Sequence, residues 1–175
     1  MSDQPNVVVL GSANLDIVVP VPHHPAIGET VLGGHHDRIP GGKGANQAVA
    51  AARLGARVAM VGRVGSDDAG RTLRTALQDA AVDCKHLAVD SQAPSGLALI
   101  GVDEDGDNTI IVSPGANNRV GPDDVAAAAP LLASAAVTLV QLEVPAMAVE
   151  AAVAAAVGKV VLNPAPASLL SAALL

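Results

Sequence analysis

The segment of residues 41–47, with the sequence GGKGANQ, constrains the fold more than any other part of the chain. Three glycines within four positions permit a tight backbone and close approach of a ligand, because no Cβ atom obstructs either. The alanine-rich residues that follow favour a helix, and Gly55 is placed to end it. A glycine turn that opens a helix leaves free backbone N–H groups at the positive end of the helix dipole, and Lys43 and Asn46 would project beside them. We therefore predict a binding floor for an oxygen-rich or anionic small molecule.

The spacing of these glycines excludes two common nucleotide-binding motifs. The segment matches neither G-x-x-x-x-G-K-[ST] nor G-x-G-x-x-G, so neither a Walker loop nor a dinucleotide fingerprint is predicted. Residues 11–14, which follow the first apolar run, do not supply G-x-G-x-x-G either. The sequence therefore argues against a dinucleotide-dependent oxidoreductase.

Composition limits the partners and the compartment. The chain has 175 residues, enough for one domain with a core, and 17 acidic against 10 basic residues give a net charge of −7. This charge argues against nucleic acid or an anionic membrane as a partner. The single cysteine, Cys84, cannot form an internal disulfide, and no signal peptide is predicted at the N-terminus, so we expect a cytoplasmic protein. Residues 125–142 carry no charge, but Pro130 and the many alanines favour a helix followed by a strand over a membrane span.

Apolar, β-branched runs alternate with helical patterns along much of the chain. Buried strands are predicted at residues 6–11, 57–64, 84–89, 137–142 and 159–162. Helices are predicted after the glycine segment, over about residues 68–81, from residue 122 onward and over residues 147–157. This alternation indicates right-handed βαβ units, and hence an α/β fold with a parallel-rich central sheet flanked by helices.

A second set of strands does not fit this alternation. Prolines separate short strands at residues 17–21 and 31–39, which confines them to edges or to a small separate sheet. Residues 97–102 and 109–112 predict a β-hairpin around an acidic turn. The glycine of that turn is at the fourth position and not the sixth, so we predict a solvated turn and no calcium site. We also predict no metal site at the two histidine pairs of this region, because exposed histidines are ordinary there.

Polar side chains follow several of the predicted strands. These are Asn14 and Asp16 after the first strand, Glu143 after a later one and Asn163 after the last, with Lys43 and Asn46 nearby in the glycine segment. In doubly wound sheets, ligands bind outside the carboxyl ends of the strands. Carboxylates accept hydrogen bonds from neighbouring hydroxyls, and amides both donate and accept, so this set suits a polyol or sugar. In the alternative interpretation, the first two residues only shape a turn and the glutamate only caps a helix.

Six motifs in order along the chain carry a family resemblance: GSANLD at 11–16, PGGKGANQA at 40–48, GSDDAG at 65–70, GAN at 115–117, QLE at 141–143 and NPAPA at 163–167. In these motifs the chain resembles the ribokinases of the PfkB carbohydrate kinase family. The resemblance implies one ribokinase-like α/β domain over residues 1–175, with a small β-sheet lid at about residues 14–40 and 97–112 that also forms a homodimer. By matched position it implies that ribose is bound by Asn14, Asp16, Gly41, Gly42, Lys43, Asn46 and Glu143.

The second signature of the family, a G-A-G-D turn at a helix N-terminus, is absent. In the family its aspartate is the general base and its glycine amides form the anion hole, so we expect no catalytic residue in this chain and place both groups beyond Leu175. The resemblance implies that the complete form transfers a phosphoryl group from ATP to the 5-hydroxyl of D-ribose, with Mg²⁺ and a monovalent cation (K⁺), whose main sites also lie in that missing C-terminal part. This chain would carry the sugar-binding half, and its activity alone is doubtful. Two alternatives stay open: a non-catalytic sugar-binding or dimerising fragment, and another PfkB sugar or nucleoside kinase.

Overall fold

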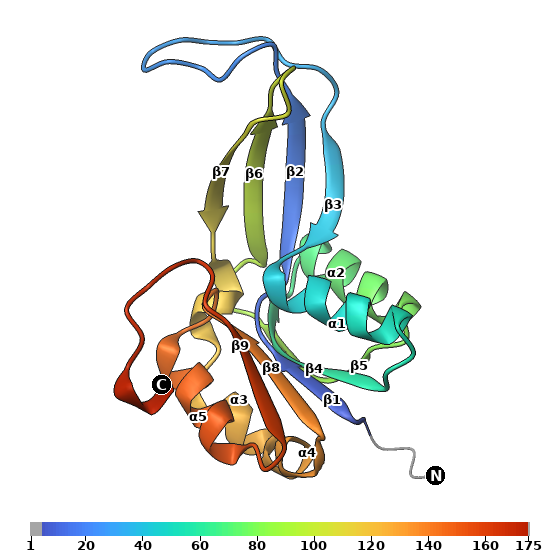
Figure 1. The fold of residues 1–175 in the computed structure, drawn as a ribbon. Helices are drawn as coiled ribbons and strands as arrows, with labels where there is room; N and C mark the ends of the chain where they lie inside the picture. The colour runs from blue at the N-terminus through green and yellow to red at the C-terminus, as the bar shows by residue number, and fades with distance from the viewer. Residues whose placement is uncertain (1–4, 175) are drawn as a thin grey trace.

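A computed structural model describes residues 5–174 and contains a large parallel sheet (Figure 1). Its strands are β1 (Val7–Leu10), β4 (Val58–Gly65), β5 (Asp83–Asp90), β8 (Val137–Gln141) and β9 (Lys159–Asn163). They are arranged in the order β5-β4-β1-β8-β9, and every neighbouring pair is parallel. The predicted α/β fold with a parallel-rich sheet is confirmed.

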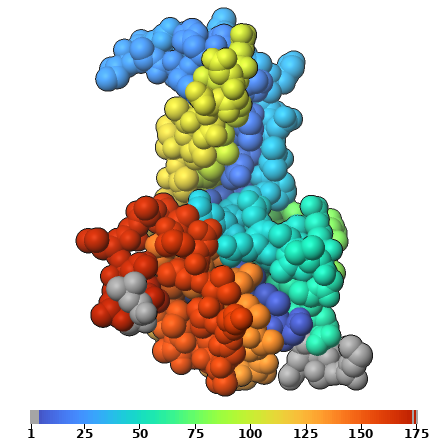
Figure 2. Space-filling view, viewed as in Figure 1, coloured from blue at the N-terminus to red at the C-terminus, as the bar shows by residue number. Residues whose placement is uncertain are grey.

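A second sheet, which we call the small sheet, projects from one end of this body (Figures 1 and 2). It consists of β3 (Asp37–Gly41), β2 (Asn14–Pro20), β6 (Gly96–Val102) and β7 (Asn108–Ser113), in that order. β2 is antiparallel to β3 and parallel to β6, and β6 and β7 form the predicted hairpin. The chain enters the small sheet directly from the end of β1, so the base of the small sheet lies at the carboxyl edge of the large sheet.

Helices cover both faces of the large sheet. One face carries α1 (Lys43–Arg53) and α2 (Asp68–Asp79), and the other carries α3 (Pro122–Ala127), α4 (Ala129–Ser134) and α5 (Ala146–Ala155). Within residues 5–174, no helix has the length and apolar content needed to cross a lipid bilayer.

The core has two halves that meet at β1. Alternate residues of a strand point to opposite faces, so Val9 packs with α1 and α2, whereas Val8 and Leu10 pack with the helices of the other face. All three side chains are fully buried. No aromatic residue occurs in the sequence, and valine, leucine and alanine with Met60 fill both halves. Two short 3-10 helices, η1 (Gly115–Arg119) and η2 (Ala172–Leu174), complete the described chain.

Three details differ from the sequence predictions. The strand expected at residues 31–39 is only Asp37–Gly41, because residues 31–36 have no regular structure. The helix expected from residue 122 is two short helices, since the chain leaves helical geometry at Ala128 and Pro130 starts a new first turn. The strand β9 was expected to be buried on both faces, but it forms an edge of the large sheet and its Val161 is 45% exposed.

Candidate functional site

A cavity of about 140 Å³ lies between the small sheet and the carboxyl edge of the large sheet. Six of the seven predicted site residues line it: Asn14, Asp16, Gly42, Lys43, Asn46 and Glu143. The opposite wall is apolar and is formed by Ala98 and Ile100 of β6 and by Ile110 and Val112 of β7. The tertiary structure therefore brings together residues that are up to 129 positions apart, 14 to 143.

Asn14 and Asp16 lie in β2 itself and not in a loop after the first strand. As alternate residues of one strand they face the same side, so both point to the cavity. The seventh predicted residue, Gly41, pairs with Asn14 across the β2–β3 ladder and lies behind Asp16. A Cβ atom at Gly41 would collide with the Asp16 carboxylate, so this glycine provides the space that the carboxylate occupies. Asn163 does not line the cavity, because it pairs with Gln141 at the β8–β9 edge.

Glu143 organises the start of α1. Its Oε1 atom is 2.7 Å from the Nζ atom of Lys43, and its Oε2 atom accepts hydrogen bonds from the Ser12 hydroxyl at 2.6 Å and the Lys43 backbone N–H at 3.0 Å. Ser12 in turn accepts from the backbone N–H groups of Gly44, through its hydroxyl oxygen, and of Ala45, through its carbonyl oxygen. The prediction that the first amides of α1 are free for a ligand is therefore wrong, because Ser12 and Glu143 already bind three of them.

Two glycines allow α1 to start this close to the end of β1. Gly42 has φ of 90°, in the left-handed region that side chains disfavour. A Cβ atom at Gly44 would lie 2.6 Å from the backbone nitrogen of Ser12, which is closer than real Cβ contacts allow. The glycine segment was predicted to allow a ligand to approach, but at Gly44 the group that approaches is the protein's own backbone.

The two carboxylates of the cavity differ in their surroundings. Burial raises the pKa of Asp16, the nearby Glu143 raises it further, and Lys43 opposes this effect. Burial also tends to raise the pKa of Glu143, but the hydrogen bonds from Lys43 and Ser12 outweigh it and lower the pKa. Within residues 5–174 no protein group donates a hydrogen bond to the Asp16 carboxylate, whereas both Glu143 oxygens are bonded. Asp16 is thus the carboxylate whose lone pairs are free for a ligand.

Sequence reasoning assigned no role to two polar residues beside the cavity. Ser12 is fully buried and joins Glu143 to α1, and Asn117 of η1 is 1% exposed and donates a hydrogen bond to the Asn14 side chain. Both belong to motifs that carried the family resemblance, GSANLD and GAN. The motifs signalled that these positions mattered, but a motif does not show which side chain a residue contacts.

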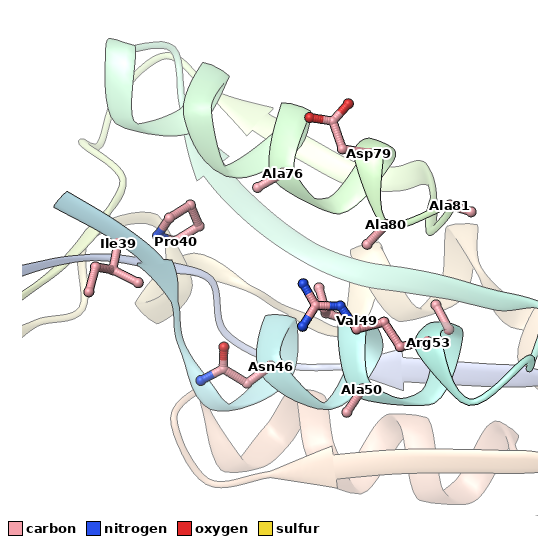
Figure 3. Close-up of a pocket in the computed structure, with 11 residues that line it drawn as sticks. Ile39, Pro40, Asn46, Val49, Ala50, Arg53, Ala76, Asp79, Ala80 and Ala81 are labelled. Atoms are coloured by element: carbon pink, nitrogen blue, oxygen red, sulfur yellow. The ribbon is translucent and has the colours of Figure 1, made fainter.

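A larger hollow of about 710 Å³ lies between α1, α2 and β3 (Figure 3). Its walls are mainly alanines with Ile39, Pro40 and Val49, and its polar side chains are those of Asn46, Arg53 and Asp79. The Asp79 carboxylate points away from α1 in Figure 3. The smaller cavity gathers two carboxylates, two amides and an ammonium, whereas this hollow has one carboxylate, one amide and one guanidinium, so we assign the functional site to the smaller cavity.

Among residues 5–174, no three histidine, cysteine, aspartate or glutamate side chains converge as a set of ligands. In the histidine-containing region, His23 contacts Glu29 at 3.0 Å, and His24 contacts Thr109 at 3.0 Å. These side chains thus have partners within the protein.

Known proteins resemble this chain in sequence and in fold. Residues 4–174 match the pfkB family of carbohydrate kinases. The chain is 44% identical to the ribokinase of Haemophilus influenzae over 170 residues, which cover 95% of this chain and 56% of that protein. The solved ribokinase of Thermotoga maritima superposes with a TM-score of 0.86 at 32% identity, covering 97% of this chain and 56% of that one. For the Arabidopsis thaliana ribokinase, solved in complex with ribose and ATP, the TM-score is 0.79 at 34% identity, with coverage of 91% and 53%.

The chain spans about half the length of the curated relatives it matches, such as 56% of the Haemophilus and Bacillus subtilis proteins. In this chain, the matched residues form the large sheet, the small sheet and the cavity between them. On the family match over nearly all its residues and on its identity to these relatives, the chain belongs to the pfkB family of carbohydrate kinases.

Proposed function

We propose that this chain carries the sugar-binding half of a ribokinase-type enzyme, and that the complete protein transfers a phosphoryl group from ATP to the 5-hydroxyl of D-ribose. The family membership and the relatives named ribokinase support this proposal. The solved complex of the Arabidopsis thaliana relative with ribose and ATP supports the choice of both substrates.

The observation that carries the proposal is that the Asp16 carboxylate accepts no hydrogen bond from residues 5–174. A half-buried carboxylate with no donor from the protein has unused acceptor capacity, which two neighbouring sugar hydroxyls would fill. Lys43 and Asn46 supply donors on the adjacent wall, and Gly42 leaves room for the ligand. The apolar side chains of β6 and β7 would cover the carbon face of the sugar and exclude water.

The small sheet has the placement of a lid, since it forms one wall of the cavity and projects beyond the body. It also exposes large apolar side chains, with Ile110 53% and Ile111 70% exposed. Exposed apolar patches of this kind mark association surfaces. We therefore propose a homodimer formed through the small sheet.

ATP, Mg²⁺ and a K⁺ ion belong to the proposed reaction, and the family resemblance implies that their main sites lie beyond Leu175. Residues 5–174 contain no set of metal ligands, and the Glu143 carboxylate is engaged by Lys43 and Ser12. The role of this half is accordingly to bind and orient the sugar. A cytoplasmic location fits a kinase that uses ATP and a chain whose one cysteine, Cys84, is a buried free thiol.

A second function is a sugar-binding module without catalysis. Residues 1–175 supply the proposed sugar-binding residues and contain no G-A-G-D signature. General bases contribute a factor of about 10²–10⁴ to the rate, and anion-hole donors about as much. We would favour the sugar-binding module if the purified chain binds D-ribose but forms no ribose 5-phosphate from ATP. Turnover well above background would instead place the catalytic groups within these residues.

Calorimetric titration of the chain with D-ribose tests the proposed site. Asp16→Ala should weaken ribose binding by on the order of 2–4 kcal/mol, since hydrogen bonds to a charged group are lost. Asp37→Ala is the matched control, because Asp37 is an exposed aspartate of the same small sheet and does not line the cavity. Equal loss of affinity in both variants would contradict the assignment of Asp16, and saturable ribose binding unaffected by Asp16→Ala would place the sugar elsewhere.

A further inference from the structure

Asn117 connects the base of the small sheet to the strand that carries the site. It lies in η1, which follows β7, and its side chain is almost completely buried. Its Oδ1 atom accepts a hydrogen bond from the Ala13 backbone N–H at 3.0 Å. Its Nδ2 group donates to the Ala13 carbonyl oxygen at 3.1 Å and to the Oδ1 atom of Asn14 at 2.7 Å. Asn117 thus bonds both backbone groups of Ala13 and the side-chain oxygen of Asn14.

These contacts fix which way the Asn14 amide points. The two ends of an amide side chain are hard to distinguish by shape, so their assignment depends on an unambiguous neighbour. The Ala13 N–H can only donate, so the Asn117 atom facing it must be the oxygen. The other atom of Asn117 is then the nitrogen, which can only donate, so the Asn14 atom facing it must be an oxygen as well.

The Nδ2 group of Asn14 is consequently on the other side of the amide, and it forms no hydrogen bond with residues 5–174. Asn14 lines the cavity next to Asp16, two residues along the same strand. The cavity thus presents an N–H donor at Asn14 and a carboxylate acceptor at Asp16, side by side.

We infer that Asn117 is a positioning residue that holds Asn14 as a hydrogen-bond donor toward the ligand. This inference rests on the proposed function and adds that Asn14 is the donor, and the ligand the acceptor, in the hydrogen bond between them. The ligand atom opposite Asn14 must be an acceptor, such as a ring oxygen or a hydroxyl oxygen, whereas the group opposite Asp16 must donate. A polyol in which a hydroxyl faces Asp16 and an oxygen lone pair faces Asn14 meets both requirements.

Gly96 provides the space for this arrangement. It pairs with Asn14 across the β2–β6 ladder, and a Cβ atom there would collide with both the Asn117 Nδ2 and the Asn14 Oδ1 atoms. The contact between the side chains of Asn14 and Asn117 therefore occupies the space that a side chain at residue 96 would need.

Two isosteric variants of the whole chain test the inference. Asn14→Asp keeps an oxygen opposite Asn117 but replaces the donor in the cavity by an acceptor. Asn117→Asp keeps the bond from the Ala13 N–H but removes the donor to Asn14, so the Asn14 amide should turn and present its oxygen to the cavity. Each variant should weaken D-ribose binding at least tenfold. Asn118→Asp, the same charge change at an exposed neighbouring residue, should leave the affinity within about twofold.

The titration separates a loss of positioning from a loss of folding. Its stoichiometry reports the fraction of the chain that is folded, whereas its dissociation constant reports the affinity of the folded chains for D-ribose. Asn117→Asp that binds ribose as tightly as the unchanged chain would overturn the inference, whatever its stability. Wild-type affinity in Asn14→Asp would overturn the predicted donor polarity.

Side-chain amide signals in NMR spectra of the ¹⁵N-labelled chain give a readout that does not need the sugar. The Asn117 NH₂ protons should exchange slowly with water, and the Asn14 NH₂ protons should exchange quickly until D-ribose is added. Slow exchange of the Asn14 NH₂ group in the free chain would overturn the orientation. If the unchanged chain fails to bind ribose at all, the proposed function fails for this chain, while the exchange rates still decide how Asn14 is oriented.

Discussion

Lys43 and Glu143 lie 100 positions apart in the sequence and form an ion pair with an Nζ–Oε1 distance of 2.7 Å. The pair joins the first residue of α1 to the chain that leaves β8. The Glu143 side chain is only 13% exposed and that of Lys43 is 38% exposed, so the carboxylate is the partner more strongly shielded from water. Its second oxygen caps α1, which makes this glutamate a structural part of the candidate site as well as part of its wall.

Removing the charge of Glu143 should destabilise the fold. In Glu143→Gln, an amide nitrogen would face one of the donors that the carboxylate now accepts from, so at least one buried donor loses its partner. We expect a loss of about 1–3 kcal/mol in the free energy of unfolding, measured by chemical denaturation. Solvent screening of the half-exposed lysine reduces the share of the ion pair in this loss. Glu104→Gln, at an exposed position of the β6–β7 turn, is the control and should change stability by less than about 0.5 kcal/mol.

The stabilising effect of Glu143 on the free energy of unfolding should depend on pH. The pKa of Glu143 is lower in the folded chain than its ordinary value near 4.5, so folding favours the ionised form. Its stabilising contribution is therefore fully present above the unfolded-state pKa and is lost as the pH falls through the folded-state pKa. The difference in unfolding free energy between the unchanged chain and Glu143→Gln should be constant above about pH 5.5 and should shrink below pH 4.5. A difference that grows on acidification would contradict the hydrogen-bonding pattern.

Asp16 should make ribose binding sensitive to acid. Burial and the neighbouring Glu143 raise its pKa, and only the ionised carboxylate accepts hydrogen bonds at both oxygens. The affinity for D-ribose should therefore decrease as the pH falls through this raised pKa, at a higher pH than an ordinary aspartate near 3.8 would require. In Asp16→Asn, the weaker remaining binding should lose this dependence. An identical pH profile in both proteins would show that another group titrates.

Gly44→Ala tests the close contact between α1 and β1. In an ordinary helix interior this change stabilises by roughly 0.5–1 kcal/mol. Here the new methyl group would lie 2.6 Å from the Ser12 nitrogen and 2.7 Å from the Gly11 carbonyl carbon, both backbone atoms, so the helix must shift. We expect destabilisation of about 1–3 kcal/mol in thermal or chemical unfolding.

Gly121→Ala is the control for this steric effect, because the nearest atom to a Cβ there is 3.9 Å away. It should change stability by about 1 kcal/mol or less. Equal stability of the two alanine variants would mean that α1 can move away from Ser12 without penalty.

The proposed dimer can be tested on both faces of the small sheet. Ile110 and Ile111 are successive residues of β7, so their side chains point to opposite faces, and Ile110 lines the cavity. We expect that either Ile110→Ser or Ile111→Ser shifts the sedimentation coefficient from dimer toward monomer, and that the effective variant identifies the face of association. A dimer that survives both substitutions would exclude the small sheet as its main interface.

Much of the fold is local in origin, and those parts followed from the sequence. β1 was predicted because three valines follow one another, β4 because valines recur in a mostly apolar run, and α1 because alanines dominate the residues between the glycine segment and Gly55. Gly55, with φ of 90°, does follow the end of that helix. Predictions failed where local preference was weak, as at residues 31–36, and at Ala128, where a proline two positions later starts a new helix.

The sequence by itself determined most of the strands and helices, the family and the polar residues that line the cavity, because each of these depends on residue types at short spacings. Only the tertiary structure decided what those residues do to one another. It assigned the amides of α1 to Ser12 and Glu143, left the Asp16 carboxylate without a donor from residues 5–174, and set the direction of the Asn14 amide through Asn117. These contacts join residues that the chain separates by 32 to 131 positions. A hydrogen bond depends on distance and direction in space, and no pattern within one segment specifies either for a partner so far along the chain.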